Sequence, residues 1–160
     1  MCDKVGVPAK RVTVIYNGVV PVQTVTDEEA QACKAELGIS DCYPLPGVVG
    51  SLYPVKGHRF LLDAMPKILR RFPKTTLLVI GRGELEVELK EQVEQLAIAS
   101  NVHFLGIRQD VPRLLSVLNA FVLPSLSEGL SLALLEAMAG NAGQAFSPSR
   151  KMQKILRPIL

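Results

Sequence analysis

Two glutamates eight residues apart, Glu128 and Glu136, lie in a segment whose other residues are mostly apolar or small. The positions three and four residues to either side of Glu136, its neighbours on a helix, hold only alanine, glycine and leucine. A buried carboxylate needs a hydrogen-bonding partner, and the vicinal hydroxyls of a ribose would offer two donors side by side. The alternatives are a Lys or Arg from another element, or solvent beyond the short neighbours.

The residues just after the first glutamate add a second kind of chemistry. Gly129, Leu130 and Ser131 stand at an expected helix start, where free backbone N–H groups form a ready site for an anion. A polar loop residue before a helix is common, so Glu128 alone indicates little. As a whole, the segment predicts a phosphate at this helix start with carboxylates beside it.

A lysine, Lys56, precedes Gly57 and a further expected helix. Its charge, together with the helix dipole, could neutralise a diphosphate, although a solvated surface lysine is the alternative for any one of eighteen basic residues. The stretch from Gly81 to Gly83 lacks the third glycine of a dinucleotide-binding fingerprint and is interpreted as a turn. His58 and His103 are interpreted as structural.

Short apolar runs, which we expect to be strands, alternate with segments of helical period. These strands and helices must position the candidate residues. It predicts an α/β fold with a doubly wound parallel sheet, in which ligands bind at the carboxyl ends of the strands. Asp27 is the expected cap of the first helix and Gly38 its stop, and Asp110 is the expected cap of a short fourth helix. Strands are expected at 12–16, 48–52, 77–80, 102–105 and 120–123, and the other helices at 28–37, 58–71, 85–99 and 130–139.

Composition excludes several classes of protein. The 160 residues carry a formal charge of only +3, with the basic residues scattered, so no nucleic-acid partner is expected. Three cysteines without C-x-x-C spacing, and two isolated histidines, predict neither a disulfide scaffold nor a metal site, and they favour a reducing compartment. No signal segment or long apolar run is present, which predicts a soluble cytoplasmic domain. A peripheral membrane association of a longer protein stays open.

Together, these segments resemble the C-terminal, nucleotide-sugar-binding domain of retaining GT-B glycosyltransferases of family 4, also called group 1. The resemblance covers residues 10–139 in the family's order and spacing. The matching stretches are VIYNG (14–18), VVGSLYPVKGHRFLLDAM (48–65), LLVIGRGE (77–84), NVHFLG (101–106) and NAFVLPSLSEGLSLALLEAMA (119–139).

The resemblance implies a role for each matching residue. Lys56 would contact the donor diphosphate, the catalytic Glu128 would lie near the donor sugar hydroxyls, and Glu136 would hold the ribose. The backbone of Gly129, Leu130 and Ser131 would approach sugar and phosphate. Gly106 and Ile107 would flank the base. The implied reaction is transfer of a hexose from a nucleotide-diphosphate sugar with retention, with no cofactor and no metal. The acceptor would be a sugar or a lipid-linked sugar, bound through a missing N-terminal domain.

The sequence also departs from the family pattern. Ser51 stands where the family usually has an Arg that shares the diphosphate with the lysine, and Ser131 replaces a common glycine. After residue 139 the pattern is lost. We therefore expect a partial donor-binding domain at 1–139, a poorly ordered tail at 140–160, and an unpaired sheet edge through which chains could self-associate. Such a fragment is expected to be inactive alone.

Two other classes of function compete with this interpretation. A non-catalytic nucleotide-binding or interaction module would keep the same fold, and Ser51 favours it slightly. A signalling receiver domain is excluded because it needs acidic residues at strand ends to hold magnesium, and glycines and a proline occupy those ends here.

Overall fold

The computed structural model describes residues 25–129 and 131–140, the backbone of 144–146, and the isolated positions 11, 13, 15, 18 and 19. Most of the strand expected at 12–16 therefore lies outside the described residues. The elements, in chain order, are α2 (Asp27–Glu36), β1 (Pro46–Val49), η2 (Pro54–Lys56), α3 (His58–Arg71), β2 (Leu77–Ile80), α4 (Glu86–Gln95), η3 (Ala99–Asn101), β3 (Val102–Gly106), α5 (Val111–Ser116), β4 (Ala120–Val122), α6 (Leu132–Ala139) and β5 (Gln144–Phe146).

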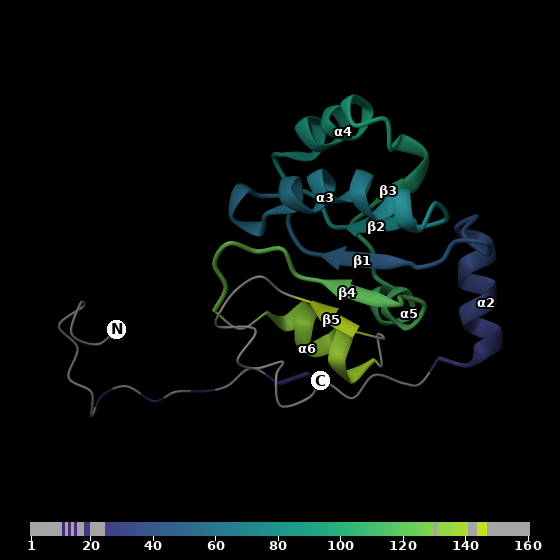
Figure 1. Ribbon diagram of the computed structural model, residues 1–160. Coiled ribbons are helices and arrows are strands. Elements are labelled where there is room, and N and C mark those ends of the chain that lie inside the picture. The colour runs from purple at the N-terminus through teal and green to yellow at the C-terminus, as the bar shows by residue number, and fades with distance from the viewer. Residues whose placement is uncertain are drawn as a thin grey trace.

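The strands form one parallel sheet in the order β3-β2-β1-β4-β5, which confirms the expected α/β, doubly wound class. Helices α3 and α4 cover one face, while α2, α5 and α6 pack on the other (Figure 1). Side chains of β2 alternate between the two cores: Leu78 and Ile80 face α5 and α6, and Leu77 and Val79 face α3 and α4. Because both faces are covered, all four are buried, as the continuous apolar run predicted.

Strand β1 lies at the point where the winding of the sheet reverses. From β1 the chain moves outward to β2 and β3, and it then returns to place β4 on the other side of β1. In such sheets the crevice at the carboxyl ends of the two strands flanking the reversal is the usual ligand site. The loops after β1 and β4 therefore meet at this crevice, and both carry candidate site residues.

Backbone contacts hold these two loops together. The Leu126 N–H donates a hydrogen bond to the Val55 carbonyl oxygen at 2.9 Å. Gly57 adopts a left-handed φ of 69°, and a Cβ at this position would lie 2.3 Å from the Pro124 carbonyl oxygen. Only glycine fits here, because a side chain would meet both backbone strain and the neighbouring chain. The lysine-glycine pair therefore has a packing reason as well as its predicted chemical one.

The caps of two helices differ from expectation. Helix α2 is capped by Thr26 and not by Asp27: the Thr26 Oγ1 accepts from the Glu29 N–H, and the Glu29 carboxylate accepts from the Thr26 N–H. This reciprocal pair needs a Thr three residues before a Glu, which places Asp27 inside the first turn. Asp110 is the residue before α5, but its carboxylate accepts two bonds from Arg108 instead of capping. The Arg108 guanidinium lowers the pKa of Asp110.

The edge of β4 also differs from expectation. The sequence predicted no strand beyond residue 139 and an unpaired edge, yet β5 pairs in parallel with β4 from Ala120–Gln144 to Val122–Phe146. The prediction weighed apolar side chains, whereas strand pairing uses backbone groups, and three residues suffice to cover a strand as short as β4. Self-association through an open β4 edge therefore loses its basis. The rest of the predicted tail, 141–143 and 147–160, lies outside the described residues.

Candidate functional site

The two strongest chemical candidates meet at the reversal point of the sheet. The Lys56 Nζ lies 2.6 Å from the Glu128 Oε1, although 72 residues separate them in sequence. The Glu128 side chain is 10% exposed and that of Lys56 is 30% exposed, so the pair is largely shielded from water. Lys56 ends η2 after β1, and Glu128 lies in the loop after β4. Since β1 and β4 are neighbours, the sheet itself brings the two charges together.

A serine that the sequence did not single out completes this cluster. The Ser125 Oγ donates to the same Glu128 Oε1 at 2.8 Å, and Ser125 is only 1% exposed. It lies three residues after the end of β4 and three residues before Glu128, and a serine at such a position has no distinguishing pattern in the sequence. The carboxylate thus receives two donors on one oxygen.

The helix that follows begins later than expected. Helix α6 starts at Leu132, and Ser131 is its N-cap, with its Oγ accepting from the Leu134 N–H at 3.3 Å. The sequence had placed Gly129 and Ser131 inside the opening of the helix. A serine side chain competes for helix N–H groups and so favours the cap position. Leu130 lies outside the described residues.

Glu136 occupies the middle of α6 and is partly exposed. Among the described residues, no hydrogen bond or ion pair reaches its carboxylate, so the alternative of a Lys or Arg partner finds no support there. The alternative that it reaches solvent is compatible with its partial exposure. The structure brings Lys56 and Glu128 into contact, but it shows no contact between Glu136 and that pair.

Three glycines join the ends of the first three strands at the same edge. The Gly50 N–H donates to Ile80, and the Gly81 N–H donates to the Gly106 carbonyl at 2.8 Å. A Cβ on Gly81 would lie 2.0 Å from the Gly50 oxygen, so glycine is needed here for the close approach of two backbones. The turn that leads into α4 lies just after the Gly81–Gly83 stretch, at residues 84–85, where the Glu86 N–H donates to the Gly83 carbonyl oxygen.

The remaining predicted residues are spread along this edge. Ser51 lies two residues after the end of β1 and is exposed. Gly106 ends β3 with a φ of 67°, and the Ile107 side chain after it is 74% exposed. Because β3 lies two strands from β1, these two residues border the crevice at a distance from the Lys56–Glu128 pair.

His58 opens helix α3 two residues after Lys56 and is buried, with 3% exposure. Neither ring nitrogen finds a hydrogen-bond partner among the described residues. Burial, and secondarily the charge of Lys56, lower the pKa of His58 to about 4. The ring is therefore neutral near pH 7, and of Lys56 and His58 only the lysine carries a positive charge there.

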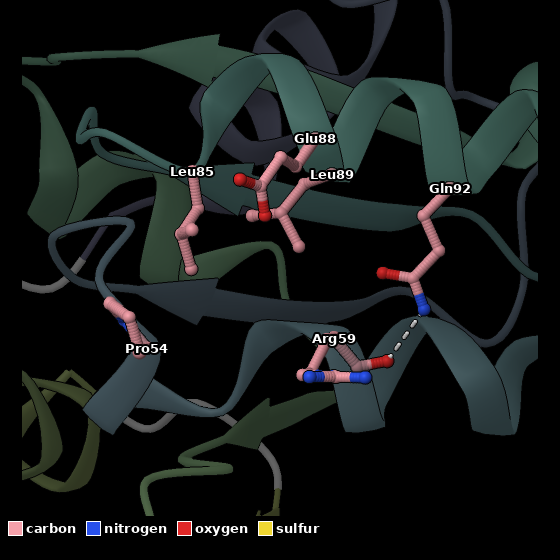
Figure 2. A pocket seen from close by; sticks show the side chains of 6 residues that line it. All are labelled: Pro54, Arg59, Leu85, Glu88, Leu89 and Gln92. Carbon is pink, nitrogen blue, oxygen red and sulfur yellow. Dashed lines mark hydrogen bonds between the residues drawn. The ribbon is translucent and has the colours of Figure 1, made fainter.

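A separate pocket of about 310 Å³ lies between the start of α3 and helix α4 (Figure 2). Its walls include Arg59 from α3 and Glu88 from α4, and Gln92 closes one end by donating to the Arg59 carbonyl at 3.0 Å. None of the predicted site residues lines it. No motif in the sequence indicates this pocket.

The described part of the chain lacks the features of two other kinds of site. No helix there has the length and apolar character needed to cross a membrane. Within the same residues, no three His, Cys, Asp or Glu side chains gather as the ligands of a metal would.

The arrangement at the reversal point suits an anionic ligand with hydroxyl groups. Lys56 offers a movable positive charge, and Glu128 offers one carboxylate oxygen beyond the one already bonded. Glu136, on the helix that follows the Glu128 loop, offers a further acceptor with no partner among the described residues. A phosphate ester of a sugar carries both chemistries, since its phosphate matches the cation and its hydroxyls match the carboxylates.

Comparison with known proteins gives consistent results. The profile of a family described as Glycosyl transferases group 1 matches residues 44–142. The uncharacterized glycosyltransferase MJ1607 of Methanocaldococcus jannaschii is 30% identical over 98% of this chain and 41% of its own length. The UDP-Gal:alpha-D-GlcNAc-diphosphoundecaprenol alpha-1,3-galactosyltransferase of Escherichia coli is 35% identical over 58% of this chain and 24% of its own length.

Solved structures share the fold. The crystal structure of Anabaena HepE in complex with UDP and glucose superposes with a TM-score of 0.85 at 23% identity, over 96% of this chain and 42% of that chain. This chain therefore spans less than half of the length of each of these three proteins.

Proposed function

Because the chain belongs to the group 1 glycosyltransferases, we propose that it binds a nucleotide-diphosphate sugar and provides the donor half of a hexosyltransferase that retains the anomeric configuration. The observation that carries the proposal is the Lys56–Glu128 pair at the reversal point of the sheet. The shared fold with HepE, whose crystal structure contains UDP and glucose, supports the choice of ligand.

Each residue at the crevice has a proposed contact. Lys56 binds the diphosphate, Glu128 lies against the donor sugar hydroxyls, and Glu136 accepts from the two ribose hydroxyls. The backbone of 129–131 approaches sugar and phosphate, with Ser51 beside the diphosphate. Gly106 and Ile107, two strands away, flank the base at the far end of the ligand.

The chemistry that these groups can supply is electrostatic. When the bond between the sugar and the diphosphate breaks, negative charge grows on the leaving phosphate oxygens and positive charge grows on the sugar ring. A cation beside the leaving group stabilises this separation, and the effect is large where water is excluded. Since Ser51 supplies no charge, Lys56 bears this role alone among the residues predicted to contact the diphosphate. No metal is included in the proposed mechanism.

The proposal also covers acceptor and location. A sugar or lipid-linked acceptor would bind residues outside this chain, and the reaction would take place in the cytoplasm. Cys33 and Cys42 are free thiols in the structure, as a reducing compartment allows.

Binding of UDP tests the proposal directly. The full 160-residue chain should bind UDP at millimolar concentration, and Lys56→Ala should weaken this binding at least roughly tenfold, because charged hydrogen bonds to phosphate are among the stronger ones. Lys67→Ala, an exposed lysine on α3, is the matched control and should bind as the unchanged chain does. Equal binding by both variants would contradict the assignment.

Transfer by the isolated chain is a separate matter. Positioning two substrates together can lower the barrier by ~7–11 kcal/mol, and a donor site without an acceptor site forgoes most of this. We therefore propose that the 160-residue chain shows no detectable transfer from common nucleotide-sugars. Robust turnover by the purified chain would contradict this part of the proposal.

A non-catalytic nucleotide-binding module is the second candidate, and Ser51 is the observation that favours it. Introducing the family's arginine tests whether the diphosphate lies beside Ser51. If Ser51→Arg strengthens binding of UDP several-fold, the diphosphate lies where the catalytic family places it. If the substitution leaves binding unchanged, the ligand of this fold is held elsewhere.

A further inference from the structure

Two donors share one oxygen of Glu128, and their side chains differ in how far they can move. The Lys56 Nζ at 2.6 Å ends a long, partly exposed side chain, and the Ser125 Oγ at 2.8 Å belongs to a short, buried one. A lysine can swing its ammonium group to another acceptor by rotating its side chain. A buried serine next to a strand end keeps its place.

We propose that Ser125 is a positioning residue that holds Glu128 in place when Lys56 leaves it for the donor diphosphate. This inference rests on the proposed function, since it assumes that Lys56 binds the diphosphate. In the empty site, Lys56 and Ser125 share the carboxylate. In the occupied site, Lys56 turns to the phosphate oxygens, and the Ser125 hydroxyl keeps Glu128 from being left without a partner.

The energetic reason lies in the low exposure of the carboxylate. At 10% exposure, Glu128 has little access to water once its cation is withdrawn. A shielded carboxylate without a partner is costly, and this cost would count against diphosphate binding. The second donor removes much of that cost. It also keeps the carboxylate turned so that its bonded Oε1 faces the protein and its other oxygen is available to a ligand.

Backbone contacts between the two loops hold Ser125 in the position that this role requires. Ser125 follows the buried Leu123 and Pro124, which come directly after β4. The Pro124 carbonyl packs on Gly57, and the Leu126 N–H, one residue beyond the serine, donates to the Val55 carbonyl oxygen. The serine is therefore fixed to the same two loops that carry the ion pair, so its hydroxyl does not depend on Lys56 for its position.

A double-mutant cycle on UDP affinity tests this inference with the full 160-residue chain. Ser125→Ala should weaken UDP binding roughly threefold to tenfold, because withdrawing Lys56 then leaves Glu128 unpaired. Glu128→Gln should bind UDP as tightly as the unchanged chain or more tightly, because no carboxylate competes for Lys56. In the Glu128→Gln background, Ser125→Ala should change the affinity less than about twofold. A loss of equal size in both backgrounds would show a packing role and overturn the inference.

Ser125→Cys separates hydrogen bonding from shape, and it keeps the test usable if the alanine variant does not fold. A thiol fills nearly the same space but donates weakly, so this variant should lose affinity as Ser125→Ala does. If it binds UDP like the unchanged chain, filling of the site is what matters, and the inference is wrong.

The outcomes also separate this inference from the proposed function. If UDP binds and Lys56→Ala weakens it while the Ser125 variants change nothing, only the role of Ser125 fails. If the unchanged chain and Lys56→Ala respond to UDP alike, the donor site itself is misplaced and both proposals fail.

Discussion

Glu128 and Glu136 are eight residues apart, yet they differ in burial and in hydrogen-bond partners. Glu128 lies in a loop, is nearly buried, and receives both a lysine and a serine. Glu136 lies on a helix, is partly exposed, and receives neither a hydrogen bond nor an ion pair from the described residues. One carboxylate is thus part of a preformed cluster, and the other is an acceptor that the described protein leaves unused.

The difference shows which part of a donor site can be built into a single domain. The groups proposed to meet the charged and reacting end of the ligand are held by contacts between loops 51–57 and 123–129, which the order of the strands makes neighbours. The group proposed for the ribose needs only a rigid helix to present it. Preorganisation is therefore concentrated at Glu128, and stability should depend on it far more than on Glu136.

Separating the two loops should have the largest effect. Gly57→Ala would place a methyl group 2.3 Å from the Pro124 oxygen in a left-handed conformation, so backbone strain and a backbone clash combine. We expect a loss of about 4 kcal/mol in the free energy of unfolding, measured by urea denaturation. Gly129→Ala is the matched control, since its Cβ would meet nothing within 4 Å, and it should change stability by less than about 0.5 kcal/mol. Similar values for the two variants would mean that the loops are not held as described.

The free energy of unfolding should depend on pH through His58, two residues after Lys56. Its pKa is lowered from 6.5 to about 4 in the folded protein, so the unfolded chain takes up this proton first as the pH falls. The contribution to stability is complete above pH 6.5 and is lost between pH 6.5 and about 4, amounting to about 3 kcal/mol. His58→Leu should reduce the change in the free energy of unfolding between pH 6.5 and about 4. The pH dependence that comes from the acidic residues should remain. A variant with the profile of the unchanged protein would exclude His58 as the cause.

The two glutamates themselves should differ in thermal or urea unfolding of the protein without nucleotide. Glu128→Ala leaves the buried Ser125 hydroxyl and the Lys56 cation without their shared partner, and it should cost about 2 kcal/mol. Glu136→Ala removes no contact seen in the structure and places a good helix former in α6, so the change should stay within about 0.5 kcal/mol. If Glu136→Ala is the more destabilising of the two, the contrast between the carboxylates is wrong.

The sequence predicted the sheet well where side-chain pattern decides the structure. The run at Leu77–Ile80 and the stripe at His58–Arg71 have the bounds predicted for them, because burial on both faces or on one face leaves a clear period. It failed where hydrogen bonds between specific groups decide: Thr26 as cap, Ser131 as cap, and the backbone pairing of β5. Which donor wins a cap, and whether a short segment pairs, depend on neighbours that a linear pattern does not contain.

In the candidate site too, residue types could be predicted from the sequence, whereas specific hydrogen bonds could not. Lys56 and Glu128 were found by their residue types, and the order of the strands explains why they meet. Their direct bond and the part of Ser125 follow only from the loop geometry, since a serine after a strand has no distinguishing pattern. The Figure 2 pocket between α3 and α4 was not foreseen, because it arises from the spacing of two helices and not from any motif.

The most direct measurement of the central claim is a map of backbone amide shifts in the full chain as UDP is added. A ligand at the reversal point should perturb the amides of Lys56, Gly129 and Glu136 at millimolar UDP, because the first two are proposed to flank the diphosphate and the third the ribose. The rival surface in the same molecule is the pocket between α3 and α4, and shifts confined to Arg59, Glu88 and Gln92 would place the nucleotide there. The first pattern is the one predicted, and the second would contradict the assignment of the donor site.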